Sequence, residues 1–295
     1  DTVNIAKAVK YSDKATQVER LYIESMQSLI VADYPQGIAL LERLVARYPD
    51  EKDAYQLLGI CYGRLHQLQK STDYYLKTLE LDSLFADGYA VLIHNLFNLG
   101  DYDKSIWASD KYISLKPNEA APYAFRGDIE AMNGDNDRAI AWYRKAAELN
   151  PGSFIVNLGT AYILAQQYSR ADSCFQFMAA SGESKDKRSS GRYLLAMTPL
   201  YQGKFNETRR ILDEGIAADR MEKAFLRAYR TKFVYRAFVH ELFGQFDSAL
   251  HQIEQIKTNY PKNYNYRDKF FAPPNHARLL ALNKRFDEAE LVAES

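Results

Sequence analysis

The stretch "GDIEAMNGDNDRAIAWYRKAAELNP", residues 127–151, contains a spacing of small and aromatic residues that decides the fold. Glycine stands at 127 and 134, alanine at 139 and 146, tyrosine at 143 and proline at 151. Small residues let two helices approach closely, and proline ends a helix because it lacks an N–H donor. These offsets therefore predict two packed helices joined by the polar turn "NGDND".

The same spacing recurs along the chain. Small residues, separated by intervals of 34, 34, 34, 32, 37, 41 and 40 residues, stand at Gly37, Ser71, Ser105, Ala139, Ala171, Thr208, Ala249 and Ala289. The position twelve residues before them is small in seven of eight copies, and the position three before is aromatic in six of eight. Proline stands twelve residues after in four of seven. Four coincident columns indicate an internal repeat of about 34 residues.

Within each repeat, apolar residues follow a helical period on both sides of a short polar turn. Each repeat is therefore predicted to be a helix hairpin, in a chain with no sheet and about 16 or 17 helices. The hairpin turns are expected near residues 33–36, 67–70, 101–104, 134–137, 167–170, 203–206, 244–247 and 284–287.

These residues resemble the tetratricopeptide repeat, a family of helix–turn–helix units of about 34 residues. The segments "YQLLGICY" (55–62) and "IVNLGTAY" (155–162) match the first helix of that unit through a Leu-Gly pair and the Tyr that follows it. The second helix is matched by Ala139, Tyr143, Ala146 and Pro151. The resemblance covers roughly residues 16–295. It implies an all-α fold, a right-handed α-solenoid of tetratricopeptide-type helix hairpins.

A narrower resemblance concerns two segments near the N-terminus. "ERLYIES" (19–25), followed by "LVARYPDEKDAYQLLG" (44–59), is similar to repeat modules found downstream of effector domains in bacterial multidomain regulators. We expect one solenoid over 1–295 with about eight repeats. Residues 1–17, with a helix over 1–12, would be part of a preceding repeat, 18–185 regular repeats and 186–295 longer, irregular ones. No polar capping helix is visible at the C-terminal end, so we expect the chain to be a piece of a larger protein.

The longer intervals between repeats predict local departures. We expect a polar inter-repeat loop at 181–190, a lengthened helix at 221–243 and a kink at Pro199. Residues 262–275 are expected to form a loop tucked against the last repeats, with a binding lid as the alternative. The lengthened helix would carry a basic strip, either a solvated face or a docking strip for an acidic partner. Its residues are Arg220, Lys223, Arg227 and Arg230.

Composition and motifs argue against several functions. Lys plus Arg equals Asp plus Glu, 38 each, so no net charge favours nucleic acid or an anionic membrane. No apolar run approaches the roughly 18 residues of a membrane span, which predicts a soluble segment; the compartment stays open, with the cytoplasm slightly favoured. No metal-binding, phosphate-binding or nucleophile motif occurs, so we predict no enzyme, no catalytic residue, no metal and no cofactor. Cys61 and Cys174 fall in separate repeats and are expected to be unbridged core residues.

The resemblance places the expected binding site on the first helices, which in the family line a concave groove that takes peptides or partner helices. The positions matching its groove offsets are Tyr22, Gln56, Arg64, His94, Asn98, Asp128, Thr160, Tyr193 and Tyr201. The basic residue and the Asn with which some members grip a terminal carboxylate are absent here. We therefore expect a non-catalytic scaffold that binds a protein or peptide of mixed charge. The alternative is a sensor or oligomerisation arm of a bacterial regulator, and a homo-oligomer is compatible with it.

Overall fold

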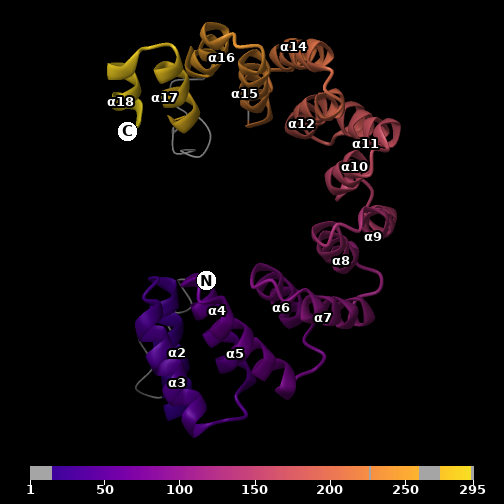
Figure 1. Cartoon of the computed structure of the whole chain (residues 1–295). Helices are drawn as coiled ribbons and strands as arrows, with labels where there is room; N and C mark the ends of the chain where they lie inside the picture. Colours follow the sequence, from indigo (N-terminus) through magenta and orange to yellow (C-terminus); the bar gives the residue numbers. More distant parts are fainter. Residues whose placement is uncertain (1–14, 226, 259–272, 294–295) are drawn as a thin grey trace. The chain divides into compact units, whose positions relative to one another are not determined.

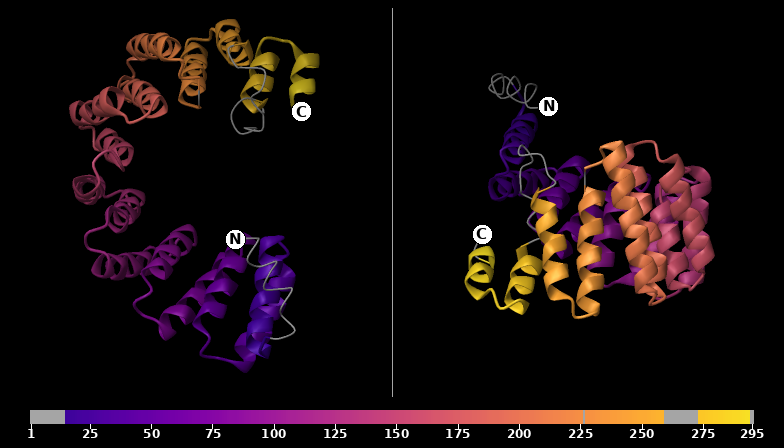
Figure 2. Two further views of the ribbon diagram at one scale, coloured as in Figure 1. Left: turned by 180° about the vertical axis from the view of Figure 1, so that it is seen from behind. Right: turned by 90° about the horizontal axis from the view of Figure 1, so that it is seen from above.

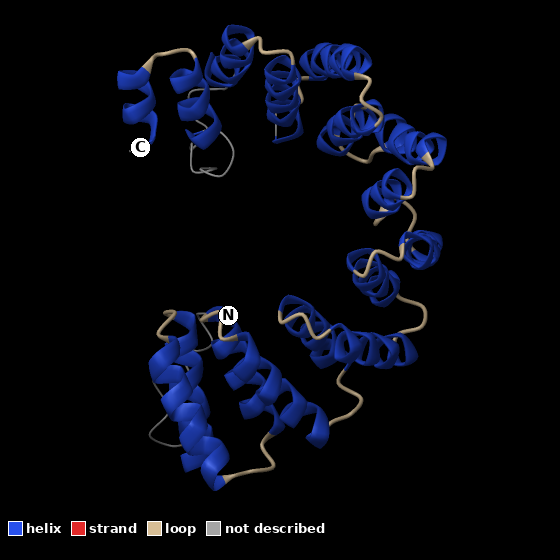
Figure 3. Cartoon of the chain, in the orientation of Figure 1, coloured by secondary structure: helices blue, strands red, loops and turns tan. Residues whose placement is uncertain are grey.

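The structure is a computed structural model that describes residues 15–225, 227–258 and 273–293. In these ranges the backbone forms helices joined by loops and turns, with no strand (Figure 3). This confirms the prediction of an all-α fold built from helix hairpins. Contacts between residues divide the chain into two compact units, Asp1–Asn150 and Pro151–Ser295. That the two units form one continuous solenoid stays a prediction.

The first unit contains four helix pairs in its described part (Figure 1). They are α2 (Gln17–Ile30) with α3 (Tyr34–Arg47), α4 (Lys52–Arg64) with α5 (Leu68–Leu81), α6 (Ala86–Asn98) with α7 (Tyr102–Leu115), and α8 (Ala120–Met132) with α9 (Asn136–Leu149). In each pair the second helix packs against the first and against the first helix of the next pair within the unit. This is the expected packing of consecutive hairpins.

The second unit also consists of helix pairs (Figure 2). The first helix of one pair is divided in two. The pairs are α10 (Ile155–Leu164) with α11 (Tyr168–Ser181), α12 (Lys185–Leu195) and α13 (Met197–Tyr201) with α14 (Phe205–Glu222), α15 (Arg227–Leu242) with α16 (Phe246–Thr258), and α17 (Pro273–Leu282) with α18 (Phe286–Ala293). Helices α12 and α15, the first helices of neighbouring hairpins, also pack against each other.

The predicted turns are confirmed. In each hairpin the second of the two helices begins three residues before the small residue of that repeat. Local chemistry explains the sharp start. The carboxylates of Asp33, Asp101 and Asp135 each accept a hydrogen bond from the backbone N–H three residues on, at 3.0 to 3.3 Å. These aspartates are N-caps, which satisfy a donor that the helix leaves unpaired. Gly134, at a φ of 81°, supplies the left-handed residue that ends α8.

Glycine on the first helix allows an aromatic ring from the second helix to pack directly on its backbone. A Cβ on Gly127 would lie 2.6 Å from the ring of Tyr143, and one on Gly159 would lie 2.4 Å from the ring of Phe175. Gly59 stands in the same relation to the ring sixteen residues after it. Real Cβ atoms do not approach that closely, so any larger side chain at these positions would push the two helices apart.

The small residues on the second helices are buried against the first helices. Ala139 has no exposed surface. The Ser71 hydroxyl donates to the carbonyl oxygen of Gly59 over 2.8 Å, and the Ser105 hydroxyl donates to that of Ile93 over 3.2 Å. In both cases the partner is the residue twelve positions earlier. The small residues of the second helix therefore face the residues twelve positions earlier on the first helix of the same hairpin.

The burial of Ala139 leads to a test of the register. We expect Ala139→Leu to lower the free energy of unfolding by roughly 1–3 kcal/mol, because the added side chain overpacks the contact between α8 and α9. Urea unfolding followed by circular dichroism measures it. The exposed neighbour Ala141→Leu is the control and should leave the stability nearly unchanged. Equal stability of both variants and the parent would contradict the register.

Pro199 divides the first helix of its hairpin, as predicted. The ring of a proline clashes with the carbonyl of the residue four before it, which here is Leu195. Helix α12 ends at Leu195, and α13 begins at Met197. The hydroxyl of Thr198, beside the proline, is buried and has no hydrogen-bond partner in the described part of the chain.

The prediction of a polar loop over 181–190 is wrong for most of that range, because α12 begins at Lys185. The Ser184 hydroxyl accepts a hydrogen bond from the backbone N–H of Lys187 and caps the helix. The buried face of this helix is polar, so its sequence does not show the regular spacing of apolar residues by which a helix is predicted. Ser189 is fully buried, and Gly191 lies against the backbone of α11, where a Cβ would be 2.4 Å from the nitrogen of Ala179.

The prediction of one lengthened helix over 221–243 is also wrong. Helix α14 ends at Glu222, because Lys223 adopts the left-handed conformation at a φ of 55°. The N–H of Ala224 then donates to the carbonyl of Asp219 over 2.8 Å, which closes the helix end. The extra residues lengthen α14 instead, and α15 begins at Arg227. The expected helix at 1–12 and residues 262–272 of the expected loop lie outside the described residues.

A buried ionic cluster joins α12, α14 and α15. Lys232 has no exposed surface, and its ammonium donates to Asp219 over 2.7 Å and to the carbonyl and hydroxyl of Ser189 over 2.8 and 3.0 Å. Asp219 is also bound by the Ser189 hydroxyl over 2.6 Å and by Arg192 over 2.8 Å. Burial lowers the pKa of Lys232 to about 8, and the charge of Asp219 opposes that change.

The two ends of this ion pair are expected to differ in their effect on stability. Asp219→Asn leaves the ammonium of Lys232 buried without its main counter-charge, so we expect a loss of roughly 3–5 kcal/mol at neutral pH. Lys232→Met is the matched control and should cost less, because Arg192 and Ser189 still hold Asp219. Urea unfolding measures both.

The pH dependence of that loss has a definite sign. Without Asp219 the folded-state pKa of Lys232 falls further below its value in the unfolded chain. The unfolded state then binds more protons, so the stability of Asp219→Asn rises with pH. Its deficit relative to the parent should therefore shrink as the pH rises towards about 8. An equal loss in both variants, constant with pH, would contradict this account.

Candidate functional site

All nine predicted groove residues lie on first helices, the face that the sequence reading assigned to binding. Tyr22 is on α2, Gln56 and Arg64 on α4, His94 and Asn98 on α6, Asp128 on α8, Thr160 on α10, Tyr193 on α12 and Tyr201 on α13. The structure brings the last three together around one pocket in the second unit. Their role in binding stays a prediction.

The six predicted residues of the first unit are distributed over four hairpins, and two of them form hydrogen bonds with side chains outside their own helix. The Tyr143 hydroxyl donates to Asp128 over 2.6 Å, and the Tyr22 hydroxyl donates to Glu51 over 3.2 Å. Burial, followed by the charge of Glu51, raises the pKa of Tyr22. Asp128 therefore fixes the ring that packs on the neighbouring glycine, which is a structural role.

The remaining residues of that set are more exposed. Arg64 is exposed at the last turn of α4, and Gln56 is half-buried on the same helix. His94 and Asn98 are exposed and lie side by side on α6, as their spacing of four predicts. The amide of Asn98 donates to the backbone carbonyl of His94 over 2.7 Å.

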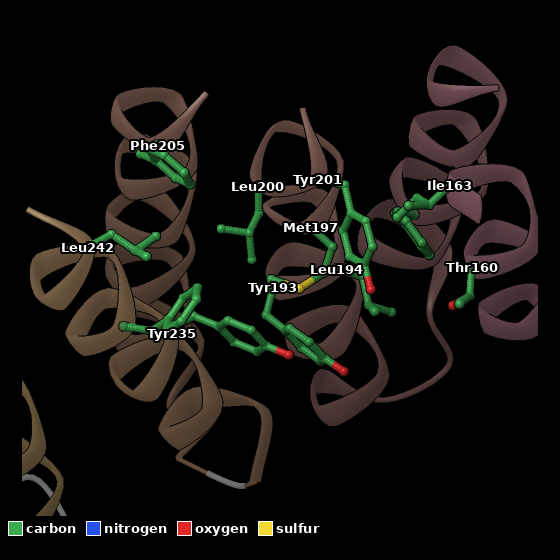
Figure 4. A pocket seen from close by; sticks show the side chains of 12 residues that line it. Thr160, Ile163, Tyr193, Leu194, Met197, Leu200, Tyr201, Phe205, Tyr235 and Leu242 are labelled. Carbon is green, nitrogen blue, oxygen red and sulfur yellow. The ribbon is translucent and has the colours of Figure 1, made fainter. Parts of the chain in front are cut away.

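The pocket of the second unit has a volume of about 560 Å³ and lies among the first helices of three hairpins (Figure 4). Its walls are formed by Thr160, Ile163, Phe175, Tyr193, Leu194, Met197, Leu200, Tyr201, Phe205, Tyr235, Phe238 and Leu242. The division of α12 from α13 at Pro199 places both pieces on its wall. Apolar and aromatic walls with a few polar groups are typical of binding pockets of about 300–1,000 Å³.

No side chain of the pocket wall carries a formal charge at neutral pH. The rings of Tyr193 and Tyr235 stack with centroids 6.2 Å apart and an interplanar angle of 15°. At the far end, Phe205 meets the ring of Phe243 edge-to-face at 5.9 Å. Such pairs hold the rings in defined positions, so the pocket wall is preorganised.

The polar groups of the pocket are chiefly three phenol hydroxyls, those of Tyr193, Tyr201 and Tyr235. Within the described residues, none of the three has a hydrogen-bond partner. Burial raises the pKa of Tyr193, and so does the neighbouring Tyr235. Burial likewise raises the pKa of Tyr235, followed by the effect of Tyr201. These two phenols therefore stay neutral at physiological pH and can both donate and accept hydrogen bonds.

Large apolar side chains on the wall remain exposed to solvent. Tyr201 is 60% exposed, Leu242 47% and Phe238 43%. They belong to α13 and α15, and they adjoin one another at the same pocket. A group of exposed apolar residues on adjacent helices marks an interaction surface more often than scattered ones do.

The predicted basic strip is divided between two helices and the turn that separates them. Arg220 is at the end of α14 and donates to the hydroxyl of Tyr229 over 3.2 Å, and Lys223 is the left-handed residue of the turn. Arg227 and Arg230 begin α15. The charge of Arg227 acts on Tyr193, because it opposes the rise of that pKa. The charge at one end of the strip therefore reaches Tyr193 of the pocket wall, although the basic strip and the groove were predicted as alternative sites.

Other chemistry is not found in the described ranges. They contain no group of three His, Cys, Asp or Glu side chains arranged to hold a metal ion. Both cysteines, Cys61 and Cys174, are buried and free, as predicted. No helix within those ranges is sufficiently long and apolar to cross a membrane.

Comparison with known proteins identifies the repeats. The family model described as "Tetratricopeptide repeat" matches residues 91–154, which span α6 to α9 apart from the first residues of α6. Residues 91–154 are therefore identified as tetratricopeptide repeats. No curated protein matches the sequence.

Solved structures of tetratricopeptide repeat proteins share this fold. A tetratricopeptide repeat protein from Parabacteroides merdae is 15% identical with a TM-score of 0.64, over 90% of this chain and 98% of that one. MamA from Desulfovibrio magneticus, residues 41 to the end, is 15% identical with a TM-score of 0.53, over 58% and 99%. Another MamA crystal structure is 19% identical with a TM-score of 0.50, over 57% and 96%. At these identities the likeness concerns the fold.

Alignment to the tetratricopeptide pattern missed the α15 side of the pocket. Tyr235, Phe238 and Leu242 were not predicted, although they lie at spacings of three and four on one helical face. The signal was present as an apolar stripe in a helix that also has a basic face. This stripe was overlooked because the extra residues of the 41-residue interval were assigned to the first helix of the hairpin, whereas they lengthen α14.

Proposed function

We propose that the chain is a non-catalytic protein-binding scaffold and that a segment of a partner protein binds in the pocket of the second unit. The observation that carries this proposal is the exposed apolar wall formed by Tyr201, Phe238 and Leu242 around a preformed pocket. Tetratricopeptide repeats generally act as scaffolds for protein partners, which agrees with the proposal.

The energetics of such binding follow from the wall. Full burial of one Leu or Phe side chain contributes about 1.5–3 kcal/mol, and the stacked rings lose little freedom on binding. The free hydroxyls of Tyr193 and Tyr235 supply hydrogen bonds to the backbone of the segment. A partner with an aromatic or aliphatic anchor side chain therefore fits the pocket.

A non-catalytic role agrees with the chemistry of the wall. Its ionisable groups are phenols, and burial raises the pKa of Tyr193 and Tyr235, so almost none of either is deprotonated and able to abstract a proton at neutral pH. Arg64, His94 and Asn98, which are exposed on first helices of the first unit, are proposed as a separate contact surface of that unit. The alternative role, an oligomerisation arm, would bury the same apolar wall against a second copy of the chain.

The test uses a random display library of 12-residue peptides selected against the whole chain. Synthetic copies of the enriched peptides are then measured by fluorescence anisotropy. We expect Phe238→Ser to weaken their binding by about tenfold or more, as loss of a central aromatic contact does. Phe177→Ser is the matched control, because Phe177 is also an exposed phenylalanine, 49%, but lies on α11 outside the pocket wall.

Three outcomes would contradict the proposal. Equal binding of the enriched peptides to Phe238→Ser and to the parent would move the site elsewhere. Failure to enrich any peptide that binds the chain would argue against a peptide site. Concentration-dependent dimerisation in sedimentation velocity that Phe238→Ser abolishes would favour the oligomerisation role instead.

A further inference from the structure

The chemistry at the α15 end of the pocket indicates which segment binds. Resting on the proposed function, we infer that the bound segment is acidic, with a carboxylate three or four residues from its apolar anchor. Arg227 pairs with that carboxylate while the anchor occupies the pocket beside Tyr235.

One face of α15 carries both groups. Arg227, Thr231, Tyr235, Phe238 and Leu242 follow one another at spacings of four, four, three and four residues, so they share a side of the helix. Tyr235, Phe238 and Leu242 belong to the pocket wall. These five residues form a stripe along α15. It begins with the guanidinium of Arg227, continues with the hydroxyl of Thr231 and ends with the pocket residues.

The length of that stripe sets the spacing in the partner. Tyr235 lies eight positions after Arg227 on the helix, a rise of about 12 Å at 1.5 Å per residue. An extended segment advances about 3.3 Å per residue, so it covers this distance in three or four residues. The acidic residue and the anchor must therefore be separated by that number of positions.

Arg227 is exposed and has no counter-charge in the described ranges, unlike Arg188, Arg192 and Arg236 of the same unit. Among the described residues, no carboxylate lies within ion-pair distance of it. By contrast, Arg188 pairs with Glu222 at 3.2 Å, and Arg236 pairs with Asp213 at 2.9 Å.

Two acidic groups at the end of α14 are occupied within the fold. Asp219 and Glu222 are bound by Arg192 at 2.8 and 2.9 Å. Asp186, in the first turn of α12, acts on the buried Lys232 through its charge alone, and its Oδ1 is buried without a hydrogen-bond partner among the described residues. An exposed guanidinium without a partner is shaped to bind a carboxylate through two parallel hydrogen bonds.

The phenols favour the same partner. Tyr193 stacks on Tyr235 and is near enough to Arg227 to respond to its charge. Both hydroxyls keep their protons at neutral pH, so they can donate to a carboxylate or to the carbonyl groups next to it. The wall has no acidic side chain to receive a lysine or arginine, and a basic segment would meet the like charge of Arg227.

The test exchanges charges between the chain and a peptide. An enriched peptide from the 12-residue display library is synthesised with Glu, Gln or Lys at the inferred position and measured by anisotropy in low salt. Against the parent chain we expect Glu to bind about tenfold more tightly than Gln, and Lys most weakly. With Arg227→Glu the order should reverse, so that the Lys peptide binds best. Arg144→Glu, an exposed arginine on α9, is the control and should leave the order unchanged.

The outcomes separate this inference from the proposed function. If peptides bind and depend on Phe238 but show no preference among Glu, Gln and Lys, the acidic partner is wrong and the pocket assignment survives. A preference for Glu that Arg144→Glu removes and Arg227→Glu does not would also overturn the role of Arg227. If no anchor peptide binds, the proposed function fails, and the inference fails with it.

Discussion

The contact between a first-helix backbone and the side chain sixteen residues later determines the geometry of each hairpin. Where the first position is glycine, an aromatic ring fills the space, as at Gly127 and Tyr143. At Ile93 the two sizes are exchanged, because the residue at this offset is a buried serine, Ser109. Ala237 keeps the order of small then large, with a buried isoleucine, Ile253, at this offset. The combined volume stays similar, so degenerate repeats keep the close packing that protein interiors require.

The pocket depends on the same contact. Phe175 is fully buried against Gly159, and its ring also forms part of the pocket wall. The next first helix has alanine, Ala196, at the glycine column and is divided by Pro199, so α12 and α13 both present side chains to the space beside that ring. A regular repeat would continue this helix without a break. The departure from the repeat pattern therefore places the pocket in the second unit.

The sequence predicts those features that are local and periodic, and it fails where the outcome depends on packing. Turns, helix caps and buried small residues depend on residues a few positions apart. The sequence therefore correctly placed Asp135 in the turn and Ala139 in the contact between the two helices. The end of α14 was not predicted, because it depends on a left-handed backbone conformation at Lys223, which lysine rarely adopts. Phe238 was missed because its role depends on which face of α15 packs inward. Of the predicted groove, three residues meet at one pocket, and the other six are distributed over separate hairpins.

The buried ionic cluster decides which face of α15 packs inward. The ammonium of Lys232 needs Asp219 and Ser189 as partners, so rotation of α15 about its axis would leave a buried charge unpaired. Tyr235 lies three residues after Lys232, about 60° short of a full turn, and is thereby directed towards the pocket. Arg227 is five residues before Lys232 and is kept on the exposed side. A hydrophobic contact at Lys232 would tolerate small rotations, whereas hydrogen bonds to fixed acceptors do not. The cluster thus aligns the basic and apolar ends of the stripe that we propose binds the partner.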